Sequence, residues 1–188
     1  IHATYDESIT RILDVYEKVN ADVPLDGTRW FIDHAETIGD RNIERIRALG
    51  GGIAIQHRMA YQGEFFAQRY GVDALRRTPP VRRMLEAGVP VGAGTDATRV
   101  ASYNPWVALY WLSTGRTVGG MAMYGDDNTL EREQALRLWT QGSAWFSGEE
   151  RAKGVLAAGQ LADFALLSAD FMTVPEARIP SIASVLTV

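Results

Sequence analysis

Three polar residues, His2, His34 and Asp96, stand at the ends of short runs that are typical of β-strands. Their separations are 32 residues (2 to 34) and 62 residues (34 to 96), which correspond to one and two units of a (β/α)₈ barrel at about 31 residues per unit. Side chains at the carboxyl ends of parallel barrel strands line the active face of such a fold. The spacing therefore predicts that these two imidazoles and one carboxylate lie near one another.

Two imidazoles and one carboxylate are a suitable ligand set for a divalent metal ion. Zn²⁺ is the first choice, because it accepts these donors and leaves a position open for water. The chain has no cysteine, so any transition metal must be held by His, Asp or Glu. A metal ion so held lowers the pKa of its bound water toward about 7. Asp96 is then expected both to bind the metal and to accept the proton of that water as a general base.

The run that ends in Asp96, VPVGAGTD, supports this interpretation. Because side chains alternate along a strand, Gly92 and Gly94 are expected to share a face with Asp96, while the residues between them face the helix layer. The glycines would leave room there for a metal ion and a substrate. A structural role is the alternative for each residue, since a single His at a strand end is often only hydrogen-bonded and an Asp after a glycine-rich strand often caps a turn.

Four further residues are candidates for contacts with a substrate. His57 ends the run GGIAIQH and could polarise a substrate carbonyl, although a structural role is an equal alternative. Tyr61, Arg99 and Tyr103 lie in segments that we expect to be loops. Loops on a rigid scaffold commonly carry binding residues, so these three side chains are candidates for meeting a small-molecule substrate.

Helix and strand patterns alternate up to Gly148, which favours βα units and a parallel sheet. Strands are expected at 28–35, 51–58 and 89–96, and the first two residues resemble the end of another strand. Helices are expected at 6–20, 39–50, 65–70, 78–88, 104–112 and 129–148. Their expected N-caps are Asp6 or Ser8, Asp40, Thr78 and Asn104. After Gly148 short β-like runs predominate, so we expect about four βα units followed by a small β-rich segment.

The composition is that of an ordinary globular domain, with 46% hydrophobic and 22% charged residues among 188. A formal net charge of −4, without a Lys/Arg cluster longer than two, argues against nucleic acid or an anionic membrane as the main partner. No apolar run approaches the roughly 20 residues that cross a bilayer, and the first residues lack a signal-peptide pattern. A cytoplasmic location is the default expectation. The glycines lack the GxGxxG order, so a nucleotide-binding fold matches poorly.

The chain resembles the C-terminal half of an amidohydrolase-superfamily enzyme, in the branch that includes N-substituted formamide deformylases. The resemblance covers nearly the whole chain in five ordered segments, which are IHATYDESITRILDVYE, WFIDHAE, NIERIRALGGGIAIQHRM, GVPVGAGTDAT and KGVLAAGQLADFALLS. It implies a metal-dependent hydrolase on a (β/α)₈ barrel, with a small β-sandwich formed jointly by the N- and C-terminal segments. It also implies that His2 and His34 are the ligands on the fifth and sixth barrel strands. Asp96 matches the aspartate on the eighth strand, which binds metal and activates water.

The family's paired His-x-His on the first strand, and its bridging Lys or Glu on the fourth, have no counterpart here. Four βα units also fall short of the eight that close a barrel, and a half barrel would expose sheet edges and apolar surface. We therefore expect residues 1–148 to supply barrel strands five to eight and residues 149–188 to belong to the sandwich. Because the chain begins with Ile1 rather than Met, we expect a piece of a longer protein, or one completed by another polypeptide, that is inactive alone.

Two functions from different classes follow from these observations. The first is hydrolysis of a C–N bond in a small amide, formamide or cyclic amide by metal-activated water. The alternative is a metal-free barrel fragment that serves as an assembly or binding module, in which His2 and His34 are only structural. A homo-oligomer is compatible with either function.

Overall fold

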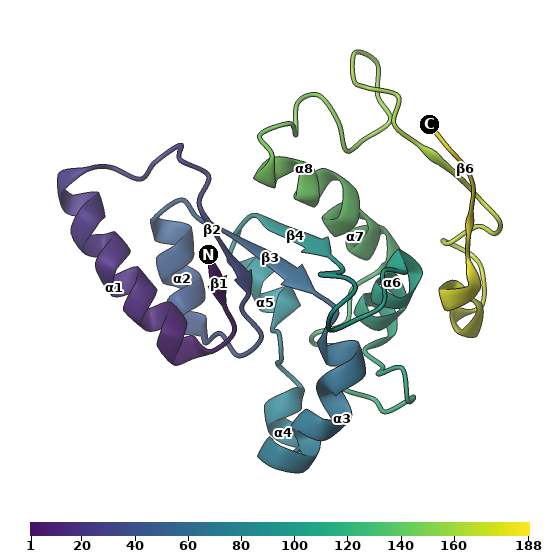
Figure 1. Cartoon of the computed structure of the whole chain (residues 1–188), viewed down its shortest axis with the longest axis horizontal. Helices are drawn as coiled ribbons and strands as arrows, with labels where there is room; N and C mark the ends of the chain where they lie inside the picture. Colours follow the sequence, from purple (N-terminus) through teal and green to yellow (C-terminus); the bar gives the residue numbers. More distant parts are fainter.

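The computed structural model describes residues 1–188 and contains one parallel sheet and one small antiparallel sheet (Figure 1). The strands of the parallel sheet lie in chain order and are β1 (His2–Ala3), β2 (Phe31–His34), β3 (Gly52–Gln56) and β4 (Val91–Gly94). The helices between them are α1 (Asp6–Asp22), α2 (Asp40–Ala48), α3 (Met59–Tyr70), α4 (Val72–Leu75) and α5 (Val81–Glu86). The predicted α/β fold with a parallel sheet is confirmed, although each strand is shorter than its sequence pattern. The helix expected at 65–70 begins earlier, at Met59.

The two faces of the parallel sheet are covered differently. Ile53 and Val91 are register partners on the face that packs against helices, and both are at most 4% exposed. This face shares one core with α1, α2 and α5, whose fully buried members include Ile9, Leu13, Ile32, Ile43, Ile46, Ile55 and Met84. On the opposite face Asp33, Gln56 and Gly94 are only partly buried. We call the surface formed by these three residues the open face.

Only one of the predicted N-caps is confirmed. Asn104 caps α6 (Pro105–Thr114), because its Oδ1 accepts a hydrogen bond of 2.9 Å from the Trp106 N–H while Pro105 occupies the first turn. The prediction for α1 is wrong. Tyr5 is its N-cap, Ser8 lies inside the helix, and Asp6 Oδ1 instead accepts a 2.6 Å hydrogen bond from the Gly39 N–H.

The predictions for α2 and α5 are also wrong. Gly39 is the N-cap of α2, so Asp40 is already the first helical residue. Helix α5 begins at Val81 after Pro80, and the Thr78 hydroxyl donates to the Ala74 carbonyl rather than capping the helix. In both cases the chain enters the helix through a residue whose side chain offers no acceptor.

A helical segment in three parts follows β4 and α6. It consists of α7 (Arg132–Arg137), the π-helix η1 (Leu138–Gly142) and α8 (Ser143–Phe146). The expected start after Thr129 is displaced, because Glu131 is the N-cap and forms a capping box with Gln134. Ser143 Oγ donates a 3.0 Å hydrogen bond to the Ala93 carbonyl. The segment therefore covers the outer edge of β4, which would otherwise present unpaired backbone groups.

The last forty residues form the antiparallel pair β5 (Ala165–Leu167) and β6 (Ser184–Thr187), joined through the 3₁₀-helix η2 (Glu176–Ser181). After Gly148, where short β-like runs are expected, only Ala165–Leu167 and Ser184–Thr187 form strands. Helix η2 packs on α6 through Ile179, which is fully buried, whereas every residue of β6 is exposed. Figure 1 shows β6 at the opposite end of the molecule from α1. None of the helices combines the length and the apolar character that a membrane crossing requires.

Candidate metal and substrate site

His2 and His34 come together at the carboxyl ends of β1 and β2. Their ring centroids lie 4.5 Å apart, with one ring edge-on to the other at 75°. The strand register pairs His2 with Asp33 and Ala3 with His34, so regular alternation would place Asp33 rather than His34 on the face of His2. His34 has a φ of +83°, in the left-handed region. This departure from strand geometry accounts for the meeting of the two rings.

The histidine pair has the properties of a partial metal site. His34 is 9% exposed, and its Nδ1 has no hydrogen-bond partner in the protein. A buried ring nitrogen without a partner is costly unless a ligand satisfies it. The free nitrogen of His34 beside the exposed imidazole of His2 fits a divalent cation. Within the chain, however, no third His, Asp or Glu joins them closely enough to complete a set of three.

Asp96 lies two residues beyond β4 on an exposed segment and is not part of the histidine group. Its φ is +52°, a conformation that Asp adopts more readily than most residues. The expectation for the preceding glycines holds for only one of them. A Cβ on Gly94 would meet nothing within 4 Å, but a Cβ on Gly92 would lie 2.6 Å from the Phe146 ring. The space at Gly92 is therefore filled by α8 and is not room for a substrate.

His57 follows β3 and is 1% exposed, with no hydrogen-bond partner on either ring nitrogen. Burial lowers the pKa of His57 to about 4, so the imidazole is neutral at pH 7. Its ring lies edge-on to that of Tyr61, with centroids 5.6 Å apart. Tyr61 belongs to α3 and not to a loop as predicted. The buried His57 and the partly buried Tyr61 therefore form a pair next to the carboxyl end of β3.

The remaining substrate candidates lie in the segment between β4 and α6. Arg99 is exposed, and Tyr103 is 76% exposed. No hydrogen bond or ion pair connects either side chain to the rest of the chain. Their proposed contact with a substrate stays a prediction.

The structure adds a buried acid that the sequence reasoning missed. Glu36 is 5% exposed, with one oxygen 3.5 Å from Arg58 Nη1 and the other without a partner. Burial raises the pKa of the Glu36 carboxyl, while the charges of His34 and Arg58 act in the opposite direction. The signal was its position two residues after His34. The sequence does not show that this turn, in which Ala35 has a φ of +52°, is buried.

Comparison with known proteins gives a consistent result. Residues 1–188 match the Amidohydrolase family. The chain is 24% identical over 182 residues to the "Putative amidohydrolase YtcJ" of Bacillus subtilis (strain 168), which covers 95% of this chain and 34% of that protein. It is 29% identical over 176 residues to the "N-substituted formamide deformylase" of Arthrobacter pascens, and this match covers 90% of this chain and 31% of that protein. The chain thus spans about a third of the length of these relatives.

The fold is also similar to that of solved structures. An uncharacterized metal-dependent hydrolase from Pyrococcus horikoshii OT3 superposes with a TM-score of 0.75 at 23% identity, covering 94% of this chain and 35% of that one. A triazine hydrolase variant superposes with a TM-score of 0.55 at 24% identity, and this match covers 84% of this chain and 32% of that one. These similarities concern the fold, whereas the match of the family model to residues 1–188 establishes that the chain belongs to the amidohydrolase family.

Proposed function

We propose that this chain supplies the C-terminal half of the barrel of a metal-dependent hydrolase that cleaves a C–N bond in a small amide, formamide or cyclic amide. Membership in the amidohydrolase family and the 29% identity to a protein named as a formamide deformylase support the reaction class. The observation that carries the proposal is the contact of His2 with His34 at the carboxyl ends of two parallel strands. Active sites of (β/α)₈ barrels lie at that end of the sheet.

The same proposal explains the organisation of the chain. Residues 1–148 would supply strands five to eight of a barrel, and residues 149–188 would belong to a small β-sandwich. The relatives are about three times as long, which is enough chain for the missing strands. The open face and the exposed strand β6 are surfaces that such a completion would cover. The completing part is either the N-terminal half of the same protein or a separate polypeptide, and we expect the isolated chain to be inactive.

His2, His34 and Asp96 would hold the metal ion, with Zn²⁺ as the first choice. When bound, such an ion supplies a water of lowered pKa and a positive charge beside a substrate carbonyl. The Asp96 carboxylate would accept the proton of the attacking water and deliver it to the leaving nitrogen. His57, which is neutral at pH 7, can donate one hydrogen bond and accept another near the scissile bond. Tyr61, Arg99 and Tyr103 would contact the rest of the substrate.

Metal analysis of the complete protein that carries this sequence tests the proposal. We expect bound metal after purification without chelators, loss of turnover of an N-substituted formamide on chelation, and recovery with Zn²⁺. The variant His34→Asn should lose the metal, whereas His57→Gln, which changes a histidine outside the proposed ligand set, should retain it. Folding of both variants is checked by circular dichroism. A metal-free protein with full turnover would refute the assignment.

One observation favours a second candidate function. Because no set of three ligands comes together within the chain, its histidines could be structural and the chain a non-catalytic assembly or binding module. In that case the complete protein would contain neither metal nor hydrolase activity, and His34→Asn would change only its stability.

A further inference from the structure

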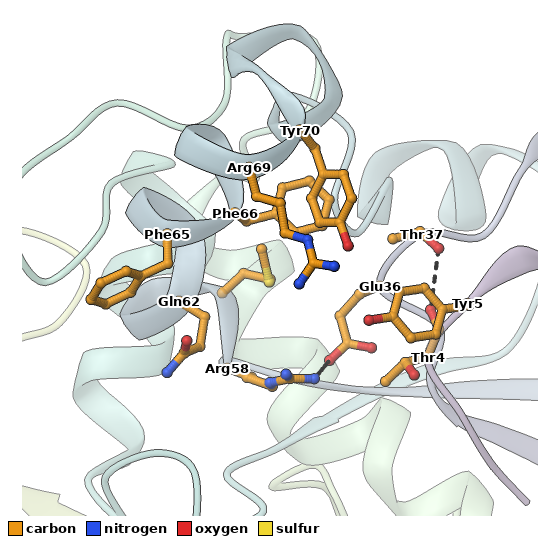
Figure 2. A pocket seen from close by; sticks show the side chains of 11 residues that line it. Thr4, Tyr5, Glu36, Thr37, Arg58, Gln62, Phe65, Phe66, Arg69 and Tyr70 are labelled. Atoms are coloured by element: carbon orange, nitrogen blue, oxygen red, sulfur yellow. Dashed lines mark hydrogen bonds and ion pairs between the residues drawn. The ribbon is translucent and has the colours of Figure 1, made fainter.

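A small cavity lies beside the histidine pair, where the segments after β1 and β2 meet α3. Its volume is about 170 Å³, which is room for roughly six water-sized groups at about 30 Å³ each. Figure 2 shows the polar side chains that point into it, and they come from different elements. The residues that matter for its chemistry are Tyr5, Glu36, Arg58, Arg69 and Tyr70.

The cavity contains a buried acceptor without a partner, on Glu36, and an exposed cation without an ion pair, on Arg69. Glu36 is 95% buried, and its Oε2 has no hydrogen-bond partner, because Arg58 approaches only the other oxygen at 3.5 Å. Arg69 forms no ion pair or hydrogen bond within the chain. Its guanidinium lies 5.2 Å from the centre of the Tyr70 ring and points toward the space above Glu36 (Figure 2). A single ligand can satisfy both groups if it carries a donor on one side and an acceptor on the other.

Charge selects among such ligands. A simple carboxylate would pair with Arg69 but would place a second negative charge beside Glu36, and a simple amine would pair with Glu36 but face two guanidiniums. A molecule with an N–H donor and a carboxylate on the same carbon avoids both conflicts. The charge-assisted hydrogen bonds that it forms are the stronger kind.

We propose that this cavity binds an α-amino-acid group, whose nitrogen donates to Glu36 and whose carboxylate accepts from Arg69. The cavity is large enough for a small amino acid, and the rings of Tyr5, Phe66 and Tyr70 provide an apolar wall for a short side chain. The group comes either from a free amino acid or from the amine part of an acylated one. This inference goes beyond the proposed hydrolysis, since it requires neither a metal nor Asp96.

Calorimetric titration of the metal-free protein with three probes tests the proposal. The probes are L-alanine, N-formyl-L-alanine and propionate. We expect L-alanine or N-formyl-L-alanine to bind at least about tenfold more tightly than propionate, which lacks the nitrogen donor. Tighter binding of L-alanine identifies a free amino acid as the ligand, and tighter binding of N-formyl-L-alanine identifies an acylated one. Absence of binding by both, or equal binding of propionate, would overturn the proposal.

Two variants and a matched control locate the binding. Arg69→Gln removes the charge that the carboxylate needs, and Glu36→Gln keeps the shape but removes the negative charge. Each should weaken binding of the preferred probe about tenfold. Arg151→Gln removes an exposed arginine outside the cavity and should leave the affinity unchanged. If Glu36→Gln proves unstable, the affinity of Arg69→Gln alone tests the proposal, because Arg69 is exposed and makes no hydrogen bond or ion pair within the chain. Unchanged affinity in Arg69→Gln contradicts the proposal even if hydrolase activity is found.

Discussion

The two faces of the parallel sheet have opposite characters. On the helix side, Ile32, Ile53 and Ile55 are fully buried and belong to one apolar core. On the open face, Asp33 and Gln56 are partly buried and share only a long hydrogen bond of 3.4 Å. Gln56 donates this bond through its amide nitrogen, and its amide oxygen has no hydrogen-bond partner although it is buried. The helix side therefore stabilises the fold, while the open face has polar groups that can bind a partner from outside the chain.

This contrast predicts where substitutions affect activity and where they affect stability. Changes at exposed positions beyond the carboxyl ends of the strands should alter chemistry and leave the free energy of unfolding nearly constant. Changes on the helix side should do the reverse. Four experiments test the contrast.

The largest effect is expected at Asp96, whose proposed role is entirely chemical. In the complete protein, Asp96→Asn should lower kcat by a factor of about 10²–10⁴, the usual contribution of a general base. The free energy of unfolding in urea should change little, because the side chain is exposed. Asp126→Asn, at another exposed aspartate, is the control and should leave kcat unchanged. An Asp96→Asn enzyme with normal turnover would exclude Asp96 as the base.

The largest effect on stability is expected on the helix side. Ile53→Ala should lower the free energy of unfolding by about 2–5 kcal/mol, because it leaves a cavity in a core position with no exposure. The matched variant on the same strand is Gln56→Ala on the open face. It should cost no more than about 1 kcal/mol, since the hydrogen bond that it removes is long. Equal losses in chemical denaturation would show that the two faces contribute alike.

Local sequence patterns were sufficient for the parallel sheet and for the cap at Asn104. Both depend on neighbours in the chain, through the alternation of apolar residues and the reach of a side chain to the next turn. The failed predictions involve contacts between distant segments. The Asp6 side chain does not cap α1 but accepts a hydrogen bond from the Gly39 N–H, 33 positions away. The space beside Gly92 is filled by the Phe146 ring.

The candidate site was predictable only in part for the same reason. The spacing of His2 and His34 indicated neighbouring strand ends, and the structure brings their rings together. The spacing did not indicate that His34 must adopt a left-handed backbone conformation for the two rings to meet. Nor did it reveal the cavity beside Glu36, because that cavity exists only where helix α3 returns toward the segments after two earlier strands.

A third prediction concerns His57, where burial without a partner should make stability depend on pH. The pKa is lowered from 6.5 to about 4 in the folded chain. Between these values the unfolded chain binds a proton that the folded chain does not. The free energy of unfolding should thus be highest above about pH 6.5 and should decline by about 3 kcal/mol as the pH falls to about 4. His57→Gln should remove this part of the pH dependence in urea denaturation, and an identical slope in both proteins would contradict the assignment.

The smallest effect separates two glycines on the same strand and the same face. Gly92→Ala should destabilise the protein by about 1–3 kcal/mol, because the new Cβ would lie 2.6 Å from the Phe146 ring and 3.1 Å from the Ser143 backbone. Gly94→Ala meets nothing within 4 Å and should change stability by less than about 1 kcal/mol. The double variant Gly92→Ala/Phe146→Ala should be more stable than the sum of the single losses predicts, because the shortest of these contacts disappears with the ring. Additive losses would mean that Phe146 does not occupy this space. If Gly94→Ala then lowers kcat in the complete protein at unchanged stability, the open face at Gly94 lies against the substrate, whereas the face at Gly92 only packs against α8.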